Sequence, residues 1–115
     1  MLFRSQVLVT NGGKQALFNL FQVLLDPGHE VLLPAPYWLS YPEMVRLAGA
    51  AVKLLPSSAA RGFRLDPTQL EAAISPASRL LVLNSPSNPT GVVLRRDELK
   101  AIAAVVRRHP QLVVV

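Results

Sequence analysis

The sequence predicts an α/β fold of three layers, in which helices flank a mainly parallel sheet. Five short apolar runs alternate with four stretches of helical character along the 115 residues. This alternation is typical of βαβ units, whose strands run parallel. Half of the residues are hydrophobic and 17% are charged, a balance that requires a buried core. One domain is expected, because no linker or internal repeat divides the chain.

The predicted strands are short apolar runs bounded by turn residues. The first, residues 7–10, leads into the glycine turn at residues 11–13, and we expect it to be buried. The second, residues 30–33, continues through Pro34 and Pro36, which keep the residue before each of them extended. The other predicted strands are residues 51–55, 79–84 and 112–115.

Capping and stop signals delimit the predicted helices. Residues 14–25 are apolar almost all round the helix, which predicts deep packing, and the Asp-Pro-Gly segment at 26–28 ends this helix. Ser40 begins the next helix, with Glu43 completing a capping box. Asp66 caps a helix that extends to about residue 74. A surface loop at 56–62 and a helix at 95–108 complete the pattern.

Composition argues against several classes of function. No apolar run reaches the ~20 residues that span a bilayer, and the N-terminus lacks the apolar part of a signal peptide, so we expect a cytoplasmic protein without a membrane partner. There is no cysteine, and the two histidines have no metal-ligand spacing, so no metal site is predicted. The net charge of +5 comes from scattered cations without interleaved aromatic residues, which favours solvated helix ends over a nucleic-acid interface.

A glycine turn, Thr-Asn-Gly-Gly-Lys at residues 10–14, joins the first predicted strand to the first helix. Such a turn leaves the first backbone N–H groups of the helix unpaired and directed at solvent, where they can bind a phosphate. The alternative is a plain turn. The segment has neither the ending of a nucleotide P-loop nor the spacing of a dinucleotide fold.

Trp38 is the only tryptophan, and it follows the second strand after an extended segment with two prolines. This rigid approach can place its ring accurately on a flat ligand, and stacking contributes about 0.5–1.5 kcal/mol beyond burial. The alternative is an ordinary tryptophan of the core.

The segment Asn-Ser-Pro-Ser-Asn-Pro-Thr-Gly at residues 84–91 follows the fourth predicted strand. It holds Asn88 at the C-terminal edge of that strand, which is where open α/β sheets bind ligands. A buried asparagine amide can donate to a phenolate oxygen and thereby lower the proton affinity of a neighbouring imine. The alternative is that the Asn88 side chain caps its own turn.

Together the three segments resemble the cofactor pocket of the fold-type I aminotransferases, which use pyridoxal 5′-phosphate, and most closely the aspartate aminotransferase group. The resemblance extends from about Val7 to Val115. It includes the Pro-Tyr-Trp segment at 36–38, the Ser-Tyr-Pro-Glu segment at 40–43 and the Asn-Pro-Thr-Gly segment at 88–91. It implies that residues 1–115 are part of the large, cofactor-binding domain.

The resemblance implies roles for four residues. The backbone amides of Gly13 and Lys14 bind the cofactor phosphate, Trp38 stacks on the pyridine ring, and Asn88 donates to the ring oxygen. Trp38 and Asn88 also face the substrate. The implied reaction transfers an amino group between an amino acid and a 2-oxo acid in amino acid metabolism, and the implied assembly of the full-length protein is a homodimer.

The resemblance also implies that the chain is a fragment, truncated at both ends, without a catalytic residue of its own. Family members place an aspartate and a tyrosine beyond the fifth strand and, further on, the lysine that binds the cofactor covalently and an arginine for the substrate carboxylate. Lys14, Lys53 and Lys100 do not match that lysine, so we expect the chain alone to be inactive. Residues 7–10 would lack their neighbouring strands and would shift, pair elsewhere or stay exposed.

Two other classes of function remain open from the sequence. One is a non-catalytic α/β binding or interaction domain that retains a phosphate-binding turn, an interpretation that the missing lysine favours. The other is a nucleic-acid binder, which only the positive charge supports.

Overall fold

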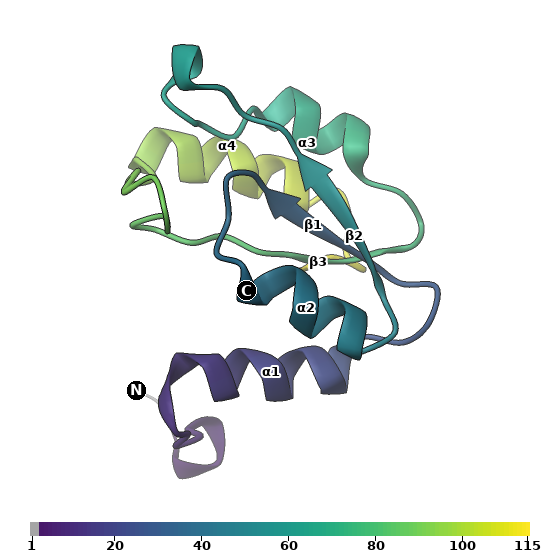
Figure 1. Cartoon of the computed structure of the whole chain (residues 1–115). Helices are drawn as coiled ribbons and strands as arrows, with labels where there is room; N and C mark the ends of the chain where they lie inside the picture. The colour runs from purple at the N-terminus through teal and green to yellow at the C-terminus, as the bar shows by residue number, and fades with distance from the viewer. Residues whose placement is uncertain (1–2) are drawn as a thin grey trace.

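The computed structural model describes residues 3–115 and has three layers (Figure 1). A four-stranded sheet lies in the middle. On one face it carries α1 (Gly12–Leu24) and α2 (Ser40–Leu47), and on the other α3 (Pro67–Ala73) and α4 (Arg96–Val106). The predicted three-layer α/β fold is confirmed.

All four strands of the sheet are parallel, as the sequence predicts. They are β1 (Glu30–Pro34), β2 (Ala51–Leu55), β3 (Ser78–Leu81) and β4 (Val113–Val114), in the order β2-β1-β3-β4. Val31 of β1 pairs with Val52 on one side and with Leu80 on the other. Beyond the end of β3, the N–H of Leu83 still donates to the carbonyl oxygen of Val115 over 2.8 Å. The last two predicted strands are therefore present with somewhat shorter bounds.

Each face of the sheet has its own hydrophobic core. Successive residues of a strand point to opposite faces. Val31 and Leu33 accordingly belong to the core beneath α1 and α2, and Leu32 belongs to the core beneath α3 and α4. All three are at most 1% exposed. Burial of β1 on both faces explains why its sequence is a continuous apolar run.

The helix boundaries follow most of the capping signals. Asp66 begins α3 as predicted, since its carboxylate accepts a hydrogen bond from a first-turn N–H over 2.8 Å. The capping box predicted at Ser40 is wrong, because Leu39 is the N-cap of α2 and Ser40 is already helical. The helical path begins early because the carbonyl of Trp38 accepts the N–H of Tyr41 over 3.1 Å.

The prediction that α1 is deeply packed is also wrong. Phe21 is the only buried residue of this helix, whereas Phe18 and Val23 are 37% and 79% exposed. The reason is that α1 lies in an outer layer, where one of its sides meets α2 and the sheet (Figure 1). Its other side meets no residue of the part of the chain that the structure describes.

The strand predicted at residues 7–10 does not form. This segment is irregular, and Val9 is 91% exposed. A strand requires a neighbour for its N–H and C=O groups, and residues 3–115 provide none at this place. Of the three outcomes expected for a segment without neighbouring strands, which were to shift, to pair elsewhere or to stay exposed, the structure shows exposure.

Two short 3-10 turns complete the chain. One, η1 (Arg4–Gln6), precedes the exposed segment, and the other, η2 (Ala59–Arg61), lies in the loop predicted at 56–62. Among residues 3–115, no helix combines the length and the apolar character needed to cross a membrane.

The first prediction concerns the core beneath α1 and α2. Leu80 of β3 is fully buried there, so Leu80→Ala should lower the free energy of unfolding by about 2–5 kcal/mol through lost burial and a residual cavity. Urea denaturation followed by circular dichroism measures this change. The control is Leu47→Ala, the same substitution at a residue of α2 that is 72% exposed, which should stay within about 0.5 kcal/mol of the parent. Equal losses in both variants would contradict the assignment of the core.

Candidate functional site

A small cavity of about 50 Å³ lies at the edge of the sheet where β1, β2 and β3 end. Each of the three connections that leave these strands contributes to its lining. Tyr37 comes from the exit of β1, Ser57 from the loop after β2, and Asn88 from the loop after β3. The C-terminal edge of a parallel sheet is the usual ligand-binding side of α/β folds. Asn88 therefore lies at the predicted edge.

The loop that carries Asn88 is closed by hydrogen bonds along its length. The N–H of Ser87 donates to the carbonyl of Val92 over 2.9 Å, and the N–H of Gly91 donates back to the carbonyl of Ser87 over 2.7 Å. Gly91 has a φ of 72°, a left-handed conformation that glycine adopts without strain. The N–H of Leu94 donates to Oγ of Ser85 over 2.9 Å at the end of the loop.

Asn88 itself is exposed, so the expectation of a buried amide is wrong in this structure. Its backbone N–H donates to Oδ1 of Asn84 over 2.9 Å. Among residues 3–115, no group makes a hydrogen bond with the Asn88 side chain. Asn84 thus makes the capping contact that the alternative prediction assigned to Asn88, and the Asn88 amide keeps both its donors and its acceptor available.

The first turn of α1 presents open backbone donors. Gly12 begins the helix with a φ of 80°, and Asn11 makes no side-chain cap. The N–H of Gly12 donates to the carbonyl of Thr10 over 2.9 Å. Within the described part of the chain, the N–H groups of Gly13 and Lys14 have no acceptor. Such unpaired amides at a helix N-terminus, next to an ammonium group, form a donor set that suits a phosphate.

The side chain of Lys14 connects this turn to Trp38. The Nζ of Lys14 is 4.9 Å from the centroid of the Trp38 ring, a cation–π distance. The ring centroids of Trp38 and Tyr41 lie 5.4 Å apart, and their planes meet at 88° in a T-shaped contact. Trp38 is half-buried, so part of its surface remains available to a ligand.

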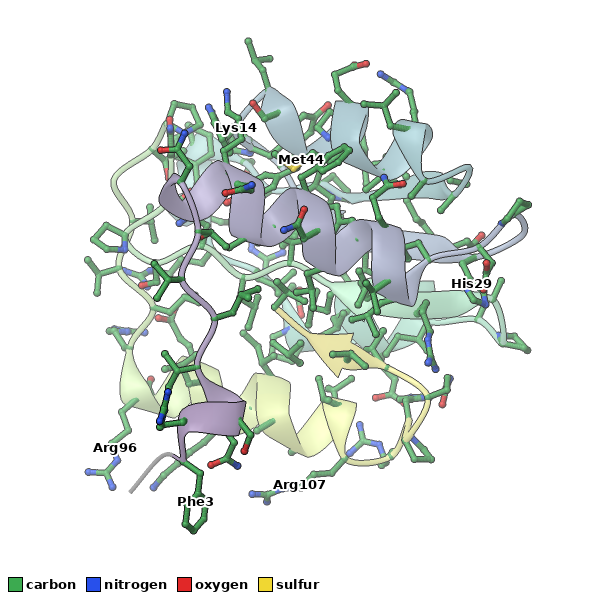
Figure 2. All side chains as sticks on the ribbon, turned by 90° about the horizontal axis from the view of Figure 1, so that it is seen from below. Phe3, Lys14, His29, Met44, Arg96 and Arg107 are labelled. Atoms are coloured by element: carbon green, nitrogen blue, oxygen red, sulfur yellow. The ribbon has the colours of Figure 1, made fainter. Side chains whose placement is uncertain are left out.

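An open groove of about 520 Å³ extends from this cluster between α1 and α2. Lys14 and Met44, which are labelled in Figure 2, both line it. The figure shows Lys14 at the first turn of α1, on the side of α2. His29 lies at the opposite end of α1, so the groove begins at the predicted phosphate-binding turn.

The structure thus brings the predicted residues together in two groups. Gly13, Lys14 and Trp38 form one group, and Asn88 belongs to the neighbouring cavity. Tyr41 joins them, because it contacts the Trp38 ring and also lines the cavity of Asn88. Tyr41 is 7% exposed, and this burial raises the pKa of its hydroxyl. The sequence pattern includes Tyr41 in a motif but assigns it no role.

Sequence reasoning missed the contribution of the loop after β2. The Oγ of Ser57 donates a short hydrogen bond to the carbonyl of Ala35, which ties this loop to the exit of β1. Phe63 adopts a positive φ of 54° and lines the same cavity. Nothing in the local sequence signals these contacts, since the partners are 22 residues apart in the Ser57 bond.

An ion pair braces the side of the cavity nearest α4. The Nη1 of Arg64 lies 2.7 and 2.6 Å from the two carboxylate oxygens of Glu98, and the N–H of Arg95 donates to the same carboxylate over 2.7 Å. The Arg95 N–H bond first, and then the Arg64 guanidinium, hold the pKa of Glu98 below its usual 4.5. Leu65 and Leu94, the sequence neighbours of the two arginines, line the cavity.

Comparison with known proteins identifies the family. The family described as "Aminotransferase class I and II" matches residues 2–115. The bifunctional aspartate aminotransferase and glutamate/aspartate-prephenate aminotransferase of Petunia hybrida is 53% identical over 110 residues, which are 96% of this chain and 23% of that protein. The aspartate/prephenate aminotransferase of Thermus thermophilus is 51% identical over 104 residues, which are 90% of this chain and 27% of the relative.

Solved structures agree with this match. The Thermus thermophilus aspartate aminotransferase with maleate superposes with a TM-score of 0.87 at 51% identity, covering 91% of this chain and 28% of that one. The aspartate aminotransferase of Rhizobium meliloti gives a TM-score of 0.88 at 42% identity, with coverages of 91% and 26%. The chain belongs to the class I and II aminotransferase family. It spans about a quarter of the length of these relatives.

The second prediction concerns the Glu98 carboxylate. A carboxyl group whose pKa is lowered by folding stabilises the fold above its unfolded pKa, and this contribution is lost as the pH falls through the lowered value. The parent should therefore be more stable than Glu98→Gln at pH 7, and the difference should shrink below pH 4.5, the ordinary value. Urea denaturation of both proteins at pH 7 and at about pH 3 tests this. A difference of equal size at both pH values would show that the charge of Glu98 contributes nothing.

Proposed function

We propose that residues 1–115 form part of the cofactor-binding domain of an aminotransferase that uses pyridoxal 5′-phosphate. The proposed reaction transfers an amino group between an amino acid and a 2-oxo acid. The observation that carries the proposal is the cluster at the start of α1, where the backbone amides of Gly13 and Lys14 are unpaired and the ammonium group of Lys14 lies over the half-buried ring of Trp38. A phosphate group attached to an aromatic ring matches this combination of donors and aromatic surface.

Each part of the cluster has one task in this proposal. The amides of Gly13 and Lys14 donate to the phosphate, and the helix N-terminus favours its negative charge. The Trp38 ring orients the pyridine ring by stacking. When bound, pyridoxal phosphate supplies the electron sink that amino-group transfer requires. Trp38 and Asn88 are also the residues of this chain that we propose to face the substrate.

Asn88 has an electronic task. Its amide N–H, which has no partner among the described residues, donates to the phenolate oxygen of the cofactor. A donor at that oxygen lowers the proton affinity of the nitrogen beside it, which brings its titration toward neutral pH. The exposure of Asn88 supports the proposal, because a ligand can reach an amide that no other residue occupies.

The names of the relatives support a substrate class. Aspartate appears in the names of both the Petunia and the Thermus relatives, as does prephenate. We therefore propose small dicarboxylic or aromatic-precursor amino acids and oxo acids as substrates, and a homodimer as the complete assembly.

The alternative of a non-catalytic binding domain has no support in these comparisons, since the relatives named above are aminotransferases.

A chimeric enzyme tests the function directly. Residues 12–115 of this chain replace the matching segment of the Thermus thermophilus aspartate/prephenate aminotransferase, with which they share about half of their residues. The chimera should transfer amino groups from aspartate, because the replaced segment carries the same fold. A folded chimera that contains cofactor but lacks this activity would reject the proposal.

The third prediction uses Asn88 in this chimera. Asn88→Ala removes one charge-assisted hydrogen bond of about 1.5–3 kcal/mol and should raise the pH midpoint of the cofactor absorbance by roughly one to two units. Trp38→Ala should instead weaken cofactor binding and leave the midpoint comparatively unmoved. Asn19→Ala, at an exposed position of α1, is the matched control and should change neither quantity. If Asn88→Ala lowers only the thermal stability, Asn88 is a turn residue and its electronic task is refuted.

The fourth prediction concerns the 115-residue chain by itself. We expect it to bind pyridoxal phosphate weakly and without a covalent bond, with a dissociation constant in the high micromolar range or above. The reason is that the resemblance places further cofactor contacts outside these residues, and each charge-assisted contact that is absent costs roughly 1.5–3 kcal/mol. Quenching of the fluorescence of Trp38 by added cofactor measures the affinity. Inorganic phosphate at the same concentrations is the control for a plain anion site. Stoichiometric labelling of Lys14, Lys53 or Lys100 after borohydride reduction would contradict the expectation of non-covalent binding.

A further inference from the structure

The loop after β3 contains two asparagines with different contacts. Asn84, at the beginning of the loop, accepts the backbone N–H of Asn88 at its Oδ1 over 2.9 Å. Asn88 makes no side-chain hydrogen bond with any residue of the described chain. Both residues line the cavity at the end of the strands. The two residues therefore have different roles in one turn. The Asn84 side chain holds the backbone of residue 88, and the Asn88 side chain remains free.

The position of Asn84 explains how it can fix the loop. Its neighbour Leu83, just beyond the end of β3, is held by the 2.8 Å bond from its N–H to the carbonyl of Val115, so Asn84 follows a fixed residue. The far end of the loop is held by the bond from Leu94 to Ser85. Between these anchors, the Asn84 bond is the one that reaches residue 88 itself.

Asn84 has no other task that the structure shows. It is exposed, so it contributes little to either hydrophobic core. Only its carbonyl oxygen is needed as an acceptor, and its amide group donates to no described residue. A side chain whose single contact is the backbone of a neighbouring asparagine acts through that neighbour.

We propose that Asn84 is a positioning residue for Asn88. By holding the backbone of residue 88, it keeps the Asn88 amide at the place where it meets the ring oxygen of the cofactor. It also prevents the Asn88 side chain from turning back to cap its own loop. This inference rests on the proposed role of Asn88, but the contact itself exists without a ligand and can be tested without one.

The first experiment measures the contact in the chain without cofactor. Solvent exchange of the Asn88 backbone amide is followed by NMR in the parent, in Asn84→Ala and in Asn84→Asp. Loss of the acceptor should speed exchange about fivefold in Asn84→Ala. Asn84→Asp retains an acceptor oxygen and should keep the slow exchange. Asn19→Ala is the control for loss of an exposed asparagine. Unchanged exchange in Asn84→Ala would overturn the proposal.

The second experiment asks whether the contact acts through Asn88. In the chimeric enzyme, Asn84→Ala should raise the pH midpoint of the cofactor absorbance in the same direction as Asn88→Ala. In the Asn88→Ala background, Asn84→Ala should add no further shift, because residues that act as one unit are not additive. A merely structural role would lower stability without moving the midpoint.

The outcomes separate this inference from the proposed function. If Asn88→Ala moves the midpoint and Asn84→Ala does not, the positioning role is overturned and the function of Asn88 stands. If the two shifts simply add, Asn84 acts on its own and the positioning role is again overturned. If neither substitution moves the midpoint in an active chimera, the electronic task of Asn88 fails, and the role of Asn84 fails with it.

Discussion

The whole arrangement depends on the burial of β1 on both faces. Leu32 points into one core, and Val31 and Leu33 point into the other. The strand also pairs on both edges, with β2 and with β3. Because every neighbour is parallel, the C-terminal ends of three strands reach the same edge of the sheet. The loops that carry Tyr37, Ser57 and Asn88 are therefore adjacent, although the chain between them is long.

Hydrogen bonds fix the loops of the site at that edge of the sheet. The exit of β1 accepts a hydrogen bond from Ser57, and the loop after β3 is closed by Asn84 and Ser85. The first turn of α1 differs, because the amides of Gly13 and Lys14 are left open, and Trp38, which contacts the Lys14 side chain, is held by aromatic contact with Tyr41. Fixed surroundings and free donors are the combination that binding sites require, since the donors then need no rearrangement when a ligand arrives.

The sequence predicts the parts of this molecule that depend on local signals. Prolines and glycines at the ends of elements, together with apolar runs such as residues 30–33, are sufficient to predict the parallel sheet and its helices. Two errors share one cause. The apolar residues of α1 and of residues 7–10 indicate burial, but burial requires a covering partner, and residues 3–115 do not provide one. The contacts of Ser57 and Tyr41 were not predictable, because they depend on how distant segments meet in space.

The order of the strands has a consequence for synthesis on the ribosome. Of the four strands described, β1 is made first, and it lies in the interior of this sheet. β2 can then pair with one edge of β1, β3 can pair with the other edge of β1, and β4 can pair with the free edge of β3. These four strands can thus assemble outward from β1, and none of the four has to be inserted between two that are already paired. For a parallel sheet, whose pairings all span long stretches of chain, this order lets each newly made segment dock as soon as it appears.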